Sequence, residues 1–158
     1  MTAITIRPAT VEDLEEVALL VRDMADDGWW KGKPVQLTKV FAIAQHVVEA
    51  PTVCLLVAEH KDLIVGVFMG EITQFLLNDR QYAEEILIFV QPSYRAAGIA
   101  RRLLEAWMSW AKERGAAEVY FAPSMDPDKP NRWDALTHAL GMTKTGCNYR
   151  KVLTYAAA

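Results

Sequence analysis

The fold is decided by the stretch from Ile86 to Leu104, which reads ILIFVQPSYRAAGIARRLL. Its first five residues are all apolar, which is typical of a strand covered on both faces of a sheet. Pro92 ends that strand, and the apolar spacing after Gly98 predicts a long amphipathic helix that stops around Gly115. A helix start leaves backbone N–H groups unpaired and carries a partial positive charge. The stretch therefore predicts an anion site, and its small residues leave room for a diphosphate.

Four residues of this turn and of the following helix start favour the same interpretation. Gly98 lets the backbone approach a ligand closely, and Arg95 adds a planar cation. Arg101 and its neighbour Arg102 are cations in the first turn of the helix, where they oppose the helix dipole unless an anion neutralises them. The string RxxGxA by itself also occurs where a helix simply follows a glycine-containing turn. The preceding strand, the proline and the helix are the context that favours an anion site.

The rest of the chain alternates between strand and helix patterns around this centre. A capping box formed by Thr10 and Asp13 predicts the start of the first helix. The order β-α-α-β-β-β-α-β-α-β predicts a mixed sheet with helices on both faces, an α/β fold that some conventions class as α+β. The expected strands are 2–7, 53–58, 63–75, 86–90, 119–122 and 143–153, and the expected helices are 10–28, 37–48, 98–115 and 133–141.

Composition restricts the class of protein. The chain has 158 residues, 52% of them apolar and 23% charged, which predicts one globular domain over 1–158 with a core at about 3–153. A net charge of −3 with scattered cations argues against nucleic acid as a partner. Cys54 and Cys147 are too few for a disulfide framework or a metal site, and no apolar run is long enough to cross a membrane. We therefore expect a cytoplasmic protein with no metal and no membrane partner.

Residues 90–104 resemble the acetyl-CoA motif, Q/RxxGxG/A, of the GNAT N-acetyltransferase superfamily, and the order of elements agrees. The resemblance covers about residues 3 to 153, and its end at 131–142 is similar to the family's NxxA…Y…GF segment. It implies a mostly antiparallel, twisted sheet of six to seven strands, acetyl-CoA as co-substrate and, as in many relatives, a possible homodimer. The cofactor residues that it implies are Ile88, Phe89, Val90, Arg95, Ala96, Ala97, Gly98, Ile99, Ala100, Arg101 and Asn131, although capping the last helix explains Asn131 equally well.

Acyl transfer to an amine requires a base. A lysine-like amine has a pKa of about 10.4, so its deprotonation at pH 7 costs roughly 4.6 kcal/mol. Glu84 and Glu85 lie at the start of the strand that leads to the cofactor loop, where family enzymes that use a glutamate place it. Strand alternation puts the two side chains on opposite faces unless a bulge intervenes. Position along the strand narrowly favours Glu84 as the base, and Glu85 remains the second candidate. The alternative is that both are solvated carboxylates.

A proton donor for the leaving thiolate is less clear from the sequence. Many relatives use a tyrosine of the last helix, but the matching positions here hold Thr137 or His138. His138 could protonate the sulfur or simply lie at the helix surface. Tyr149 is a second possible donor.

The acyl acceptor is expected to enter between the first two helices and the opposite strands. Asp26, Asp27, Trp29 and Trp30 lie in that connection, and carboxylates beside indole rings suit a cationic amine. The tryptophans could equally pack on the sheet. The favoured function is therefore an acyltransferase that moves acetyl from acetyl-CoA to a primary amine of a small molecule or peptide, by direct attack in a ternary complex. Alternatives are a non-catalytic acyl-CoA-binding regulatory module and a structural domain that binds neither.

Overall fold

The computed structural model describes residues 3–27, 31–123 and 133–146 of the chain. Within them the elements follow the order β-α-α-β-β-β-α-β-α, and short 3-10 helices, η1 (Val11–Asp13) and η3 (Pro92–Ala97), precede the first and third α-helices. The α-helices are α1 (Leu14–Asp26), α2 (Leu37–Val47), α3 (Ile99–Glu113) and α4 (Trp133–Ala139), and the strands are β1 (Thr5–Pro8), β2 (Val53–His60), β3 (Leu63–Gln74), β4 (Gln81–Val90) and β5 (Glu118–Tyr120). None of the described helices is long and apolar enough to span a bilayer.

The strands form one sheet in the order β1-β2-β3-β4-β5. Neighbouring strands pair antiparallel except β4 and β5, which are parallel. The sheet is therefore mixed and mostly antiparallel, as expected, but the described residues contribute five strands to it rather than six to seven. Of the last expected strand, residues 143–146 are not in a strand, and 147–153 lie outside the described residues.

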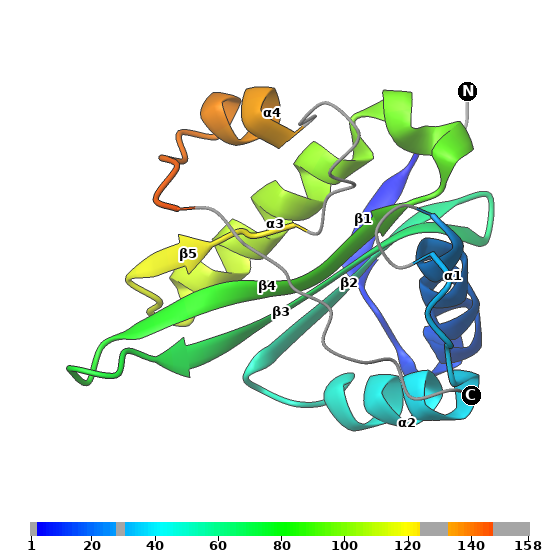
Figure 1. Cartoon of the computed structure of the whole chain (residues 1–158), viewed down its shortest axis with the longest axis horizontal. Coiled ribbons are helices and arrows are strands. Elements are labelled where there is room, and N and C mark those ends of the chain that lie inside the picture. The colour runs from blue at the N-terminus through cyan, green and yellow to red at the C-terminus, as the bar shows by residue number, and fades with distance from the viewer. Residues whose placement is uncertain (1–2, 28–30, 124–132, 147–158) are drawn as a thin grey trace.

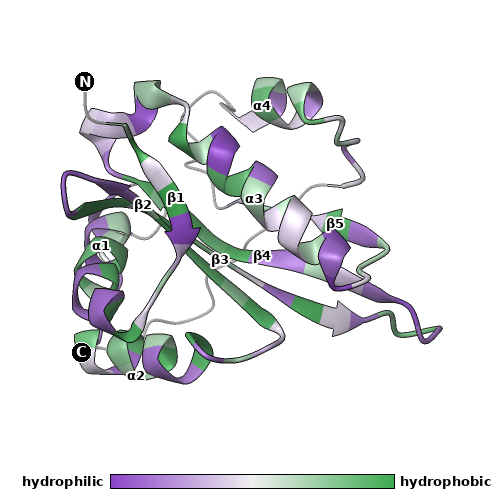
Figure 2. Ribbon diagram, turned by 180° about the vertical axis from the view of Figure 1, so that it is seen from behind, coloured by the Kyte–Doolittle hydropathy of each residue, from purple (hydrophilic) through white to green (hydrophobic). Residues whose placement is uncertain are grey.

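Helices cover both faces of the sheet, with α1 and α2 on one face and α3 on the other (Figure 1). The α3 face is filled by a cluster that includes Trp107 and Phe68, whose ring centroids are 5.0 Å apart. The α1 face is filled by a second cluster that includes Leu14, Val57 and Phe89. Figure 2 shows how apolar the central strands are between these two layers. Burial on both faces is the reason that these strands read as apolar runs instead of alternating patterns.

A β-bulge interrupts the alternation of β4. Met69 pairs with Leu87 but the adjacent Gly70 pairs with Glu85, so Ile86 is an extra residue on β4. Before the bulge, Ala83 belongs to the α3 face, and after it Phe89 belongs to the α1 face. Regular alternation would have put both residues on one face. The bulge therefore reverses the facing of β4 where the expected cofactor segment begins.

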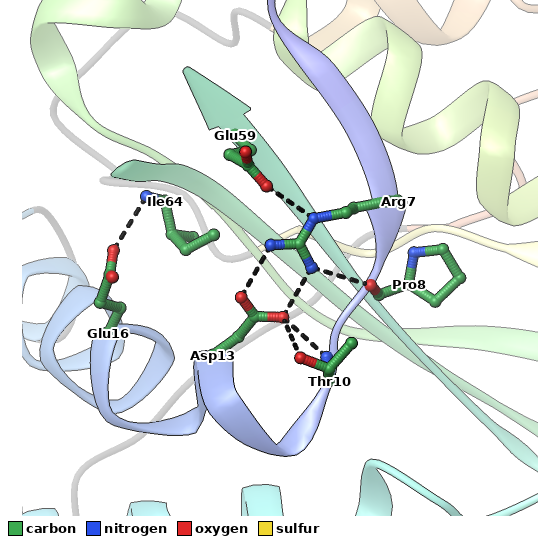
Figure 3. Close-up of polar contacts among 7 residues, drawn as sticks. All are labelled: Arg7, Pro8, Thr10, Asp13, Glu16, Glu59 and Ile64. Carbon is green, nitrogen blue, oxygen red and sulfur yellow. Dashed lines mark hydrogen bonds and ion pairs between the residues drawn. The ribbon is translucent and has the colours of Figure 1, made fainter. Parts of the chain in front are cut away.

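A buried carboxylate fixes the junction between β1 and α1 (Figure 3). Asp13 accepts two hydrogen bonds from the Arg7 guanidinium, at 2.6 and 2.8 Å, and one from the Thr10 backbone N–H at 2.7 Å. The predicted capping box is thus confirmed. Arg7 also donates through Nε to Glu59 at 2.6 Å, which ties the junction to β2. The bonds from Arg7 lower the pKa of Asp13 to about 2.

Candidate functional site

The sheet opens at one edge of β4. Pairing between β4 and β5 runs from Tyr82 with Glu118 to Glu84 with Tyr120, and no described residue pairs with this edge of β4 beyond that point. The Gln91 N–H donates to the Val65 carbonyl at 3.0 Å, so alternate residues point the other way. Ile88 and Val90 therefore direct their backbone groups away from β3, into the fork. The fork offers an extended ligand a strand edge to pair with.

A cavity of about 240 Å³ lies along this end of β4. Its size suits part of a ligand better than a whole one, because pockets for complete small molecules usually measure about 300–1,000 Å³. Five residues expected at a cofactor site, Ile88, Phe89, Val90, Arg95 and Ala100, line it together. The other two lining residues, Trp133 and Leu136 of α4, were not predicted for the site from the sequence. Both residues belong to the apolar face by which the sequence predicts the last helix.

The N-terminus of α3 begins beside this cavity. Gly98 precedes it in a left-handed conformation with φ 69° and ψ 15°, and nothing lies within 4 Å of the place where a Cβ would stand. Among the described residues no side chain caps α3, and its first turn contains no acidic residue, whereas that of α1 contains Glu15 and Glu16. In this part of the chain, therefore, no capping or acidic side chain neutralises the helix dipole at the start of α3, as an anion site requires.

The other residues of the turn differ in burial and in their hydrogen-bond partners. The side chain of Ile99 is fully buried in the core, so only its backbone could reach a ligand. Ala96 and Ala97 are exposed in η3. Arg101 donates to Glu105 at 2.8 Å, and Arg102 donates to the carbonyl of Ile4 at 2.9 Å. Both expected cations thus have partners within the chain.

Arg95 is directed towards the α1 face. Its Nε donates to the Val90 carbonyl at 3.0 Å, and its Nη2 donates to Asp27 at the end of α1. The guanidinium carbon lies 5.5 Å from the centroid of the Phe89 ring, a cation–π contact. Since Phe89 belongs to the core cluster under α1, the guanidinium lies on the opposite face of the sheet from α3.

Glu85 is the first residue of β4 after its pairing with β5 ends, at the apex of the fork. It pairs with Gly70, whose missing side chain would point at Trp107 of α3, so Glu85 lies on the α3 face. Because Ile86 is the bulge residue, the next side chain of β4 on this face is that of Ile88, which lines the cavity. Burial raises the pKa of Glu85 to about 7, and a backbone hydrogen bond from Ala122 opposes the shift. The half-buried carboxyl of Glu85, which precedes Ile88 on this face but does not itself line the cavity, can therefore take up a proton near neutral pH.

Glu84 lies on the other face of the sheet. It pairs with Glu71 on β3 and with Tyr120 on β5. Nearby, the rings of Phe75, just after β3, Tyr82 of β4 and Tyr120 of β5 form a row, with centroid distances of 4.7 and 5.2 Å. Carboxylates and aromatic rings of this kind are suited to a cationic group.

The structure does not bring every predicted site residue to the cavity. His138 is exposed on α4 and is not among the lining residues. Asn131, Trp29, Trp30 and Tyr149 lie outside the described residues. Cys54 is buried, and burial raises the pKa of its thiol to about 12. Among the residues placed in the structure, no three His, Cys, Asp or Glu side chains are grouped to hold a metal ion.

A forked sheet edge, a cavity along it and an uncapped helix start lie together at this end of β4, an arrangement that suits an extended ligand with an anionic end. Comparison with known families adds the identification. The profile of the acetyltransferase (GNAT) family matches residues 19–133. The chain therefore belongs to the GNAT acetyltransferase family, and the resemblance inferred from residues 90–104 is confirmed.

Solved structures of GNAT proteins share the fold. A predicted acetyltransferase from Clostridium acetobutylicum, crystallised with acetyl-CoA, has a TM-score of 0.76 at 13% identity, covering 96% of each chain. Glucosamine-6-phosphate N-acetyltransferase from Arabidopsis thaliana has a TM-score of 0.74 at 15% identity, covering 96% of this chain and 99% of that one. AAC(6')-Iy in complex with a CoA bisubstrate analogue has a TM-score of 0.73 at 21% identity, covering 99% of each. A comparison with curated protein sequences found no significant match.

Proposed function

We propose that this chain transfers the acetyl group of acetyl-CoA to a primary amine of a small molecule or peptide, by direct attack in a ternary complex. The observation that carries the proposal is the continuity of three features: the unpaired edge of β4, the cavity beside it and the uncapped start of α3. Acyl-CoA is an extended ligand with amides along its arm and a diphosphate at one end. Its diphosphate matches the helix start, its amides match the strand edge and its thioester end matches the cavity.

Each feature has a defined task in cofactor binding. The N–H groups at the start of α3 would donate hydrogen bonds to the diphosphate, with Gly98 allowing close approach. The backbone groups that Ile88 directs into the fork and the N–H of Val90 would pair with the amides of the pantetheine arm, while the Val90 carbonyl accepts from Arg95. The cavity lined by Phe89, Trp133 and Leu136 would enclose the acyl end and exclude water from it. Two of the structural relatives were crystallised with acetyl-CoA or a CoA analogue, which supports this assignment.

Glu85 is the favoured general base. It lies at the apex of the fork, next to Ile88 of the cavity wall, and its pKa of about 7 suits proton uptake from an ammonium group at neutral pH. The carboxylate would take the proton directly or through a water, and the neutral nitrogen would then attack the thioester carbonyl. The proposal thus moves from Glu84, which position alone favoured, to Glu85. Glu84 lies on the face by which the acceptor is expected to enter, and we propose that it attracts the cationic amine to the fork, where Glu85 would take up the proton.

A non-catalytic acyl-CoA-binding module is the second candidate. It is favoured by the exposure of His138 and by the absence of a proton donor other than Arg95 among the cavity-lining residues that the structure describes. A thiolate with a conjugate pKa near 8.5 can leave without protonation, so this observation does not outweigh the first candidate.

The two candidates and a structural role are separated by a two-stage experiment. Calorimetry with CoA comes first, followed by release of free thiol from acetyl-CoA in the presence of polyamines, aminoglycosides, amino sugars and lysyl peptides. Binding with amine-dependent thiol release is the expected result. Binding without thiol release across the panel favours the regulatory module, and no binding leaves only a structural domain.

A further inference from the structure

We propose that Asp27 is a positioning residue: by holding the Arg95 guanidinium against the end of β4, it keeps the cofactor turn in its binding conformation. The inference rests on the proposed function for its ligand, CoA. It does not rest on any contact between Asp27 and that ligand.

Three contacts fix the guanidinium. Arg95 donates to Asp27 and to the Val90 carbonyl, and its charge lies over the Phe89 ring. The contacts come from the end of α1 and from the last two residues of β4. They therefore join the turn before α3 to β4 and to Asp27, which lies 68 positions before Arg95 in the chain. Side chains of Arg95 and Asp27 are only 30% and 32% exposed, so solvent weakens this ion pair less than it would a fully exposed one.

The position of Asp27 at the end of α1 also favours a cation close to its carboxylate. Asp27 is the C-cap of α1, and the last turn of that helix contains no basic residue. A carboxylate at the negative end of a helix dipole is unfavourable unless a cation lies close to it. Arg95 supplies that cation from the cofactor turn. The pairing therefore stabilises α1 and the turn together.

The neighbouring residue anchors the turn from another strand. Tyr94 contacts His60 of β2, with the hydroxyl 3.3 Å from Nδ1 and the ring centroids 5.5 Å apart. Adjacent side chains of η3 are thus tied to β2 and to α1. A turn held in this way loses less conformational entropy when it binds a ligand, so it binds the ligand more tightly.

The test compares Asp27→Asn with Asp27→Glu and with Asp23→Asn, a matched control that removes an exposed carboxylate of the same helix, one that forms an ion pair with its neighbour Arg22. We expect Asp27→Asn to weaken CoA binding about three- to tenfold in calorimetry, the range of indirect coupling effects. The conservative Asp27→Glu should recover most of the affinity, and the control should bind CoA like the wild type. Thermal unfolding of each variant verifies that all are folded at the assay temperature.

A measurement without ligand separates this inference from the proposed function. The Nε–H proton of Arg95, bonded to Val90, should exchange slowly with solvent in the wild type and faster in Asp27→Asn, as followed by NMR. If the wild type binds no CoA, the proposed function fails, while the exchange measurement still tests the positioning. The inference is overturned if Asp27→Asn leaves the exchange rate unchanged. It is equally overturned if that variant binds CoA as tightly as the wild type or more tightly, because Asp27 would then be neutral or a competitor for Arg95.

Discussion

Glu85 lies opposite Gly70 in the β3–β4 ladder, and the register of the ladder shifts by one residue immediately beyond this pair. The shift places Glu85 and Ile88 in succession on the α3 face, so a titratable carboxyl adjoins the cavity wall. The missing side chain of Gly70 leaves room for the indole of Trp107, because a Cβ on Gly70 would lie 2.7 Å from the indole nitrogen. The bulge and the glycine together produce the buried environment that raises the pKa of Glu85.

The pH dependence of turnover tests the role of Glu85. A base must be ionised, so kcat/KM of the wild type should rise with pH up to about 7 and then level off, apart from the further rise due to the amine itself. Glu85→Gln should lower kcat/KM by about 10²- to 10⁴-fold and remove the break near pH 7. Glu84→Gln, the matched control on the opposite face, should retain the break. A break that survives in Glu85→Gln would assign the base elsewhere.

The same carboxyl makes stability depend on pH without any substrate. The pKa of Glu85 is raised from 4.5 to about 7 on folding, so between these values the folded state binds more protons than the unfolded state. Stability should therefore fall as pH rises from 4.5 to 7. Glu85→Gln should remove this loss, gaining about 1–3 kcal/mol relative to the wild type between pH 5 and pH 8 in urea unfolding. A pH dependence unchanged by the substitution would show that the carboxyl is not buried.

Two glycines that flank α3 separate backbone strain from ligand binding. Gly98 at the start and Gly115 after the end both have positive φ, 69° and 80°, and at neither does any atom lie within 4 Å of the place where a Cβ would stand. Substitution by Ala should destabilise either variant by about 1 kcal/mol in thermal unfolding. Only Gly98→Ala should also weaken CoA binding, by about tenfold, through loss of close approach to the helix N–H groups. Equal affinities of the two variants would argue against the turn as the diphosphate site.

Asp13 makes the β1–α1 junction sensitive to acid. The bonds from Arg7 lower its pKa from 3.8 to about 2, so its contribution to stability is present above pH 3.8 and is lost as pH falls through 2. Wild-type stability should fall by about 2 kcal/mol more than that of Asp13→Asn between pH 5 and pH 2. The exposed Asp23→Asn should follow the wild type. Parallel acid unfolding of Asp13→Asn and the wild type would contradict the assigned pairing.

The sequence predicted the elements that depend on local pattern. The apolar run before Pro92 and the small residues around Gly98 correspond to β4 and to the uncapped start of α3, because strand, stop and turn signals are local. The capping box of Thr10 and Asp13 is of the same kind.

Features that depend on contacts between distant segments were not predictable in this way. The bulge at Ile86 arises from pairing with β3, and a run of apolar residues contains no signal for it. The direction of Arg95 depends on Asp27, which lies 68 positions away. Because the sequence does not reveal the bulge, it does not show which of Glu84 and Glu85 lies on the α3 face. His138 was a candidate because of its distance from a motif in the sequence, but its side chain is exposed on α4.

The central claim is that the N–H groups at the start of α3 bind the diphosphate of coenzyme A. Titration calorimetry with CoA tests it most directly in the wild type and in Gly98→Glu, a substitution into open space that adds bulk and negative charge at the turn. We expect one CoA to bind per wild-type chain and no measurable binding to the folded variant. Equal binding by the two proteins, or no binding by the wild type, would contradict the claim.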